Sequence, residues 1–147
     1  MNSTYLRAAA ATLLAGTGLV VLTATDGSAS AARQNHVLTV SVRTVGSSQL
    51  GDRYLVESDK VTRNGKTIGY TANSCTFDFA AGLAHCLVTM ARPQGQLRAK
   101  VTVNAETNQI QGRVVGGTGA YRGATGTVTG GNGPQPGTQV ITLRWQD

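Results

Sequence analysis

Few side chains in this 147-residue chain are of the kinds that perform covalent or metal chemistry. The chain has two cysteines, Cys75 and Cys86, and two histidines, His36 and His85. A structural zinc site takes four ligands, commonly in closely spaced pairs, and these residues do not supply such a set. The sequence also singles out no Ser-His-Asp arrangement for a serine nucleophile. We therefore predict no metal site, and the sequence assigns no catalytic residue.

A glycine-rich stretch, GRVVGGTGAYRGATGTVTGG at residues 112–131, raises the possibility of a phosphate-binding loop. Its glycines do not have the spacing of a dinucleotide fingerprint, and no Lys-Ser/Thr pair follows them. The next residues, ATGTVTGG, are typical of a strand, where a phosphate loop would open a helix. We predict two strands joined by a tight turn over residues 118–123, with Tyr121 packed across the turn.

The first 31 residues have the layout of a secretory signal peptide. A single Arg7 precedes an apolar run from Ala8 to Val21, and Ala29-Ser30-Ala31 forms an Ala-x-Ala cleavage site. The apolar run is shorter than the roughly 20 residues of a membrane span. We predict cleavage after Ala31, a secreted domain at residues 32–147, and no membrane attachment after cleavage. Pairing of the two cysteines is the default in an oxidising compartment.

The chain carries a net charge of +6, which raises the possibility of an anionic partner. The basic residues are scattered singly, however, and few aromatic residues are available for stacking on bases. We interpret the charge as a solvated surface and predict that the protein does not bind nucleic acid.

After Ala32 the apolar residues alternate with polar ones and show no helical spacing. Glycine, proline and asparagine turns divide the chain into eight runs, which are residues 36–45, 53–63, 66–79, 84–92, 96–106, 110–117, 123–130 and 138–146. Eight strands with short links indicate an all-β antiparallel barrel or sandwich.

Asn64-Gly65 is the strongest hairpin signal in the chain, because a type I′ turn needs positive φ at both central residues. Uninterrupted pairing from this turn, together with Cys75 opposite Cys86, places one set of side chains on a common face. That set is Tyr54, Val56, Ser58, Thr71, Asn73, Cys75, Phe77, Phe79, Cys86, Val88 and Met90. The opposite face, which we predict to be the outside, then carries Glu57, Asp59, Asp78 and His85. A register shifted by one residue would instead make Glu57 or Asp59 a pocket carboxylate.

The run VVGGTGAYRGATGTVT at residues 114–129 resembles the glycine-rich signature shared by plant dirigent proteins and allene oxide cyclases. Upstream, GDRYLVESDKV and GKTIGYTANSC resemble a cyclase pattern that ends in a pocket cysteine, here Cys75. The resemblance covers roughly residues 36–146. It implies an eight-stranded antiparallel up-and-down β-barrel with an internal cavity, often trimeric, that uses no metal and no cofactor.

The resemblance also suggests pocket positions. Ser58 stands where cyclases have a pocket asparagine, and Thr39 and Ser41 stand where they have a glutamate and an asparagine. Asp59 and Arg144 are candidates for the pocket aspartate and arginine of dirigent proteins. We predict a cavity with a polar part and an apolar wall. The polar part comprises Thr39, Ser41, Ser58, Thr71 and Asn73, and the apolar wall comprises Tyr54, Val56, Phe77, Val88 and Met90.

Two functions are compatible with these features. In the first, the barrel binds a small apolar or phenolic molecule and guides its cyclisation or stereoselective coupling, as a cofactor-free cyclase, isomerase or dirigent-type auxiliary. The alternative is a non-catalytic binding or structural barrel of the cell exterior. A hollow barrel favours the first and a barrel filled by side chains the second. We also predict a homotrimer, mainly because the resemblance implies one. Four apolar residues expected on the outer face, Val61, Ile68, Tyr70 and Leu87, support this prediction.

Overall fold

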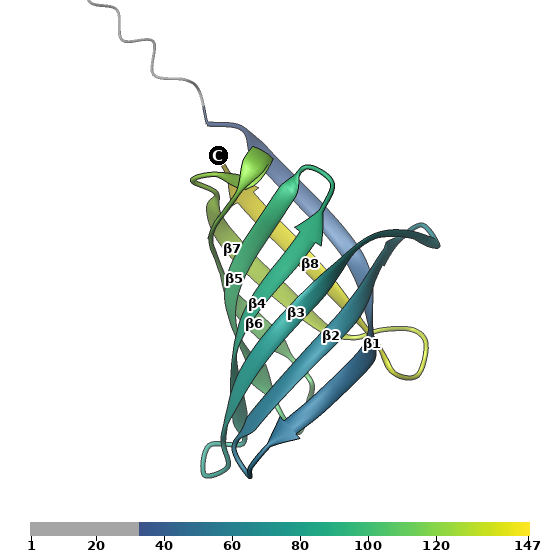
Figure 1. The fold of residues 1–147 in the computed structure, drawn as a ribbon, viewed down its shortest axis with the longest axis vertical. Helices are drawn as coiled ribbons and strands as arrows, with labels where there is room; N and C mark the ends of the chain where they lie inside the picture. Colours follow the sequence, from purple (N-terminus) through teal and green to yellow (C-terminus); the bar gives the residue numbers. More distant parts are fainter. Residues whose placement is uncertain (1–32) are drawn as a thin grey trace, which may run out of the picture. The chain divides into compact units, whose positions relative to one another are not determined.

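The computed structural model describes residues 33–147, which form one closed antiparallel β-barrel (Figure 1). Each strand pairs with the next along the chain, and the last pairs with the first, so the predicted up-and-down barrel is confirmed. The elements are β1 Asn35–Leu50, β2 Tyr54–Arg63, β3 Lys66–Asp78, β4 Leu83–Arg92, β5 Gly95–Asn104, β6 Ile110–Gly117, the 3₁₀-helix η1 Gly119–Tyr121, β7 Thr125–Asn132 and β8 Thr138–Gln146. The predicted signal peptide lies outside the described residues. Within residues 33–147, no helix is long and apolar enough to cross a membrane.

The glycine-rich stretch forms β6, a turn that contains η1, and β7, as predicted. Gly119 adopts φ +59°, a conformation that glycine reaches without steric cost. A Cβ on Gly117 would lie 2.6 Å from the Cβ of Tyr121, so glycine lets the tyrosine fold back against β6. Tyr121 is buried there, and its hydroxyl accepts a hydrogen bond of 2.9 Å from Arg92 Nη1. The stretch is therefore a structural turn.

The β2–β3 hairpin contains an irregularity that decides which way β2 faces. Arg63 pairs with Lys66 and Thr62 with Thr67, but Val61 then pairs with Gly69, so Ile68 has no partner. One extra residue in one strand is a β-bulge, and it moves every later pair by one position. Because side chains alternate between the two faces of a strand, the bulge inverts β2 relative to the predicted register.

The prediction for β2 is therefore wrong. Tyr54, Val56 and Ser58 lie on the outer surface, where Tyr54 is 56% exposed and Val56 is 42% exposed. Their neighbours Glu57 and Asp59 face the interior instead. The bulge thus gives the alternative register considered in the sequence analysis, in which Glu57 and Asp59 are carboxyl groups of the pocket.

On β1, Thr39 and Ser41 also lie outside the cavity, contrary to the prediction. The Thr39 hydroxyl is hydrogen-bonded to the Thr142 hydroxyl on the outer surface, at 3.0 Å. The apolar members of the same alternating run, Val40 and Val42, are buried and line the interior. Alternation decides the outcome, because burying the valines stabilises the barrel and burying unpaired hydroxyls does not.

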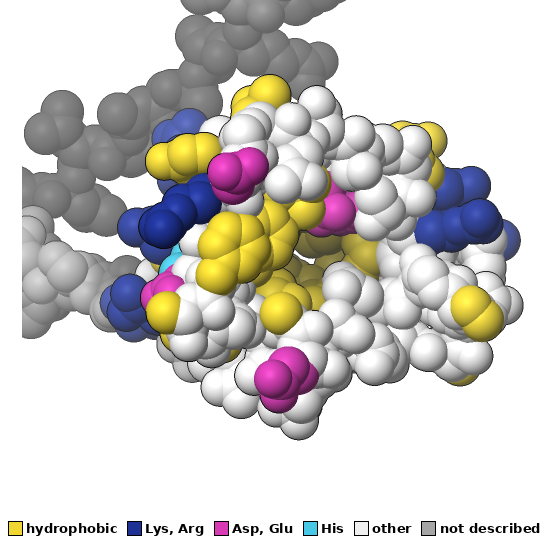
Figure 2. All heavy atoms as spheres, turned by 90° about the horizontal axis from the view of Figure 1, so that it is seen from below, with side chains coloured by type: hydrophobic (Ala, Val, Ile, Leu, Met, Phe, Trp, Pro, Cys, Tyr) yellow, Lys and Arg dark blue, Asp and Glu magenta, His cyan; other side chains and the backbone are white. Residues whose placement is uncertain are grey.

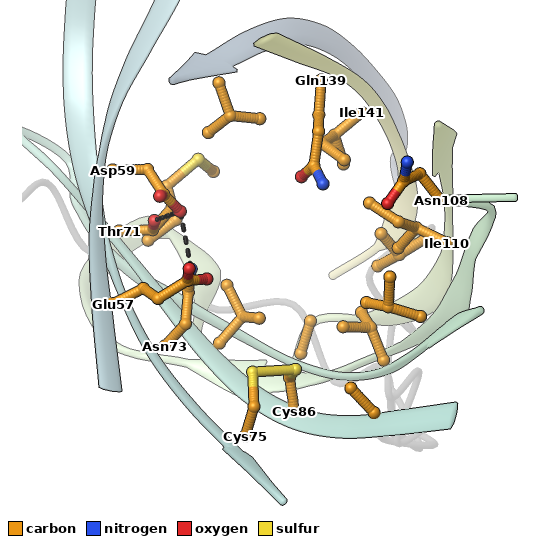
Figure 3. A pocket seen from close by; sticks show the side chains of 18 of the residues that line it. Glu57, Asp59, Thr71, Asn73, Cys75, Cys86, Asn108, Ile110, Gln139 and Ile141 are labelled. Atoms are coloured by element: carbon orange, nitrogen blue, oxygen red, sulfur yellow. Dashed lines mark hydrogen bonds between the residues drawn. A yellow bond between two sulfur atoms is a disulfide. The ribbon is translucent and has the colours of Figure 1, made fainter. Parts of the chain in front are cut away.

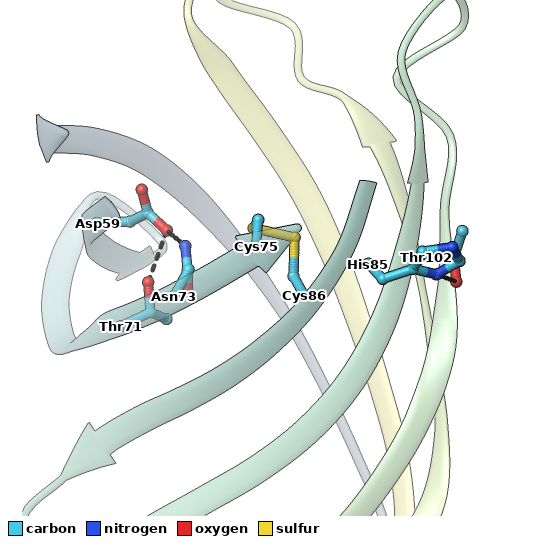
Figure 4. The surroundings of a disulfide bond; sticks show 7 residues. All are labelled: Asp59, Thr71, Asn73, Cys75, His85, Cys86 and Thr102. Atoms are coloured by element: carbon cyan, nitrogen blue, oxygen red, sulfur yellow. Dashed lines mark hydrogen bonds between the residues drawn. A yellow bond between two sulfur atoms is a disulfide. The ribbon is translucent and has the colours of Figure 1, made fainter. Parts of the chain in front are cut away.

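The predicted pairing of β3 with β4 is confirmed, with Cys75 opposite Cys86 and Asn73 opposite Val88. Cys75 and Cys86 form a disulfide on the inner side of this pair (Figure 4). His85 faces the other way, as predicted, and its Nδ1 lies 3.3 Å from the Thr102 hydroxyl on the outer surface. The disulfide thus joins two strands that form part of the cavity wall.

We expect the double variant Cys75→Ala/Cys86→Ala to have an unfolding free energy lower by about 2–4 kcal/mol, because the covalent link restricts the unfolded chain. Urea denaturation measures this difference. Dithiothreitol should lower the midpoint of the wild type and leave that of the double variant unchanged. Equal midpoints for the wild type and the double variant would contradict the expected stabilisation.

Candidate functional site

The barrel is closed at one end and hollow at the other. Near the closed end, η1 places Tyr121 edge-on against Trp145, with ring centroids 5.9 Å apart. Leu97 and Ala124 are almost completely buried in the same core. Figure 2 views the opposite end and shows a hollow bordered by hydrophobic and acidic side chains. Trp145 is therefore part of the core and does not line the cavity.

The hollow is a cavity of about 380 Å³ within the barrel. This volume lies in the range of small-molecule sites. Most of the wall is aliphatic, and the disulfide and Phe77 add to it (Figure 3). The lining residues are Val40, Val42, Leu55, Glu57, Asp59, Val61, Thr71, Asn73, Cys75, Phe77, Ala84, Cys86, Val88, Met90, Ala99, Val101, Val103, Ala105, Asn108, Ile110, Val128, Gln139, Ile141 and Leu143.

Five of the residues predicted to bind the ligand are in this wall, namely Thr71, Asn73, Phe77, Val88 and Met90. The other five, Thr39, Ser41, Tyr54, Val56 and Ser58, are not. The residues in the wall come from β3 and β4, whose register was predicted correctly. Their role in binding a ligand stays a prediction.

A polar cluster of Glu57, Asp59, Thr71 and Asn73 occupies one side of the cavity (Figure 3). The bulge makes Asp59 pair with Thr71 and Glu57 with Asn73 across β2 and β3. The Thr71 hydroxyl and the Asn73 amide both donate to Asp59 Oδ2, each at 2.6 Å. Neither bond uses Asp59 Oδ1. Asn73 Oδ1 is buried and accepts no hydrogen bond from the described residues. The cluster therefore offers Asp59 Oδ1 to a ligand as an acceptor, whereas Asn73 Oδ1 is enclosed by the protein.

Glu57 is in a different electrostatic situation. Burial raises the pKa of its carboxyl above the ordinary value of 4.5, and the nearby Asp59 raises this pKa further. Desolvation and a like charge both disfavour the ionised form. The raised pKa makes Glu57 a better donor of a hydrogen bond or a proton than an ordinary glutamate, and Asp59 accepts two hydrogen bonds at one oxygen.

Two amide side chains, Asn108 and Gln139, lie across the cavity from the acidic cluster (Figure 3). Asn108 adopts φ +56° in the turn between β5 and β6, and Gln139 is at the start of β8. Sequence analysis did not identify either residue, because neither carries a recognisable motif. Arg144, a candidate pocket arginine, is on the exposed side of β8 and does not line the cavity.

The lining supplies no obvious metal site. Within residues 33–147, no group of three or more His, Cys, Asp or Glu side chains is arranged to hold a metal ion. The chemistry available from this wall is hydrogen bonding, proton exchange at two carboxyl groups, and the shape of an apolar chamber.

Comparison with solved structures shows that this barrel has the same fold as several proteins, among them Diels-Alderases and dirigent proteins. It is similar to a pyocyanin demethylase, with a TM-score of 0.63, 19% identity, and coverage of 75% of this chain and 99% of that chain. It is also similar to the Diels-Alderase AbmU from Streptomyces koyangensis, with a TM-score of 0.61, 13% identity, and coverage of 81% of this chain and 71% of that chain. For a pterocarpan synthase dirigent protein the TM-score is 0.55 at 16% identity, over 77% of this chain and 94% of that chain.

These similarities confirm the dirigent-like barrel fold that the glycine-rich motif suggested. At such low identities they show the fold alone. No protein-family model and no curated protein matches the chain by sequence.

We expect Glu57→Gln to change how stability depends on pH. Because the pKa of Glu57 is raised by folding, its contribution to stability is complete below pH 4.5 and is lost as the pH rises through the folded-state pKa. Glutamine carries no charge to desolvate, so the variant should be more stable than the wild type at pH 7, by less than about 1 kcal/mol after solvent screening. Urea denaturation at a series of pH values measures this.

Glu106→Gln, an exposed change in the turn after β5, controls for the loss of one negative charge. Parallel stability profiles for the wild type and Glu57→Gln between pH 4 and pH 7 would contradict the interior placement of Glu57.

Proposed function

We propose that this protein is an exported barrel that binds a small apolar or phenolic molecule in its cavity and guides the cyclisation or stereoselective coupling of that molecule. The observation that carries the proposal is a cavity of about 380 Å³ with an apolar wall and one polar cluster. Export rests on the layout of residues 1–31, and a disulfide suits an oxidising compartment.

The cavity supports a mechanism based on orientation. An apolar chamber holds a reactive molecule away from water, and fixing its conformation selects one product among several. A ligand hydroxyl would donate to Asp59 Oδ1. Glu57 lies across from Asn73, and its raised pKa favours the protonated form, which would donate to an oxygen that gains negative charge as a ring closes. These contacts would orient the ligand with its apolar part against β4, β5 and β6.

The names of the similar structures are consistent with this proposal, since they denote a demethylase, a Diels-Alderase and a pterocarpan synthase. The alternative is an extracellular barrel that binds a molecule without changing it, or that serves as a structural unit. A purely structural barrel is expected to fill its interior with side chains, so the cavity argues against that form of the alternative.

We expect Asn73→Leu to weaken the binding of 2-naphthol, a small phenolic probe, by about tenfold. The change removes one of the two donors that orient Asp59 and puts an apolar side chain beside its carboxyl group, and losing one hydrogen bond to the ligand costs about 0.5–1.5 kcal/mol. Quenching of naphthol fluorescence on titration with protein measures the affinity. The disulfide and the circular dichroism spectrum should be unchanged.

Ala72→Leu is the matched control, because Ala72 is adjacent on β3 and faces outward. It should leave the affinity unchanged. Equal affinities of the wild type and Asn73→Leu for naphthol would count against the cavity as the binding site.

We also propose a homotrimer. The outer surface of β3 and β4 carries Tyr70, 55% exposed, and Leu87, 47% exposed. Val56 of β2 is in the same row as Leu87, since both pair with Ser74. Val61 does not contribute, contrary to the prediction, because it is fully buried in the barrel. Large apolar side chains exposed on one side of a barrel are commonly covered by a partner.

Sedimentation velocity at micromolar concentration should give the mass of three chains of residues 32–147. Leu87→Glu should shift the distribution towards monomer. A wild-type protein that sediments as a monomer would refute the trimer.

A further inference from the structure

The charges that reach the cavity all have one sign. Glu57 and Asp59 line it, and none of the lining residues is lysine, arginine or histidine. The chain as a whole carries a net charge of +6, so its basic residues are directed elsewhere. A ligand inside the barrel therefore experiences an acidic environment within a basic protein.

Asp59 is the more deeply buried of the two acids in the cavity. It is 8% exposed, and its partners Thr71 and Asn73 are neutral. Among residues 33–147, the single ion pair joins His36 to Asp147, so Asp59 has no cationic partner there. A buried carboxylate without a counter-charge is costly, and neutral hydrogen bonds offset only part of that cost. A positive charge on the ligand would provide the missing compensation.

A second, polar pocket of about 310 Å³ adjoins the cavity at Asp59. Thr44, Asn132 and Thr138 belong to its wall, and Asp59, Asn108 and Gln139 line both pockets. The pocket lies where β1 departs from β8, because β1 pairs with β8 only as far as Arg43. Asp59 is the single charged residue in this wall. A polar substituent next to a ligand's charged group would find hydrogen-bonding partners here.

The apolar side of the site includes one of two stacked aromatic rings. Phe77 lines the cavity and stacks on Phe79, with ring centroids 5.8 Å apart and an angle of 7° between the ring planes. Phe79 is 64% exposed, just beyond the end of β3. Aromatic faces favour planar ring systems and attract cations.

We infer that the cavity selects planar aromatic molecules that carry a positive charge, such as a quaternised heteroaromatic nitrogen, over carboxylates of the same size. The inference rests on the proposed function and names the ligand class of that cavity. Asp59 is the residue that recognises the charge, and the apolar wall binds the rings.

Three two-ring probes of similar size test this inference, namely N-methylquinolinium, 2-naphthol and 2-naphthoate. Isothermal titration calorimetry at pH 7 and constant salt should show N-methylquinolinium binding to the wild-type protein at least tenfold more tightly than 2-naphthoate. Non-specific attraction to a chain of net charge +6 would give the opposite order.

Asp59→Asn keeps the side-chain shape and should bring the ratio of the affinities for N-methylquinolinium and 2-naphthoate close to one. Asp52→Asn, an exposed change in the turn between β1 and β2, is the control and should keep the wild-type ratio. Circular dichroism verifies that each variant is folded.

If 2-naphthol binds but 2-naphthoate binds the wild type as tightly as N-methylquinolinium, charge selection is wrong and the proposed function stands. If the preference for the cation persists in Asp59→Asn, the assignment to Asp59 is wrong. If none of the three probes binds the wild type, both the inference and the proposed function fail.

Discussion

Ile68, the residue left unpaired in the β2–β3 hairpin, determines which side of β2 faces the cavity. A strand has two faces and a period of two, so one extra residue exchanges them completely. Without the bulge, Tyr54, Val56 and Ser58 would line the barrel, and both carboxyl groups would be in solvent. With it, Glu57 and Asp59 are inside, opposite Asn73 and Thr71. The chemistry available to the cavity therefore depends on one backbone irregularity outside the polar cluster.

The rest of the barrel sets the environment in which these carboxyl groups can interact with a ligand. The core around Tyr121 and Trp145 closes one end, and the disulfide fixes β3 to β4 beside the polar cluster. An apolar wall lowers the effective dielectric around the two acids, which strengthens their interaction with each other and with any ligand. Burial and the neighbouring charge raise the pKa of Glu57, while two donors satisfy one oxygen of Asp59. Two carboxyl groups on one strand thus acquire different chemical roles.

Most of the fold was predictable from alternation and turn residues. The eight strands, the Asn64-Gly65 turn, the glycine turn around Tyr121 and the pairing of Cys75 with Cys86 all follow from local patterns. The side chains of β2 that face the cavity were not predicted correctly. Hydrophobic alternation is weak in this strand, and the register with the bulge and the register without it both bury some apolar groups. A signal was nevertheless present. Each of the three irregular registers lies at a glycine within a strand, namely Gly46, Gly69 and Gly116. Such glycines often mark bulges. On β1, the prediction was wrong because the resemblance was used to assign pocket positions to Thr39 and Ser41. The alternation of the same strand favours Val40 and Val42 as the inward residues.

The central claim is that Glu57 lies inside a hollow barrel that accepts a small molecule. Carbon-13 NMR of protein labelled at the glutamate carboxyl carbons tests it directly, because the chain contains two glutamates, Glu57 and Glu106. The account predicts that the Glu57 signal titrates above pH 4.5 and shifts when 2-naphthol is added. The signal of Glu106, exposed in the turn after β5, should not respond to 2-naphthol. A Glu57 signal that titrates at or below pH 4.5 and does not change with 2-naphthol would contradict the account.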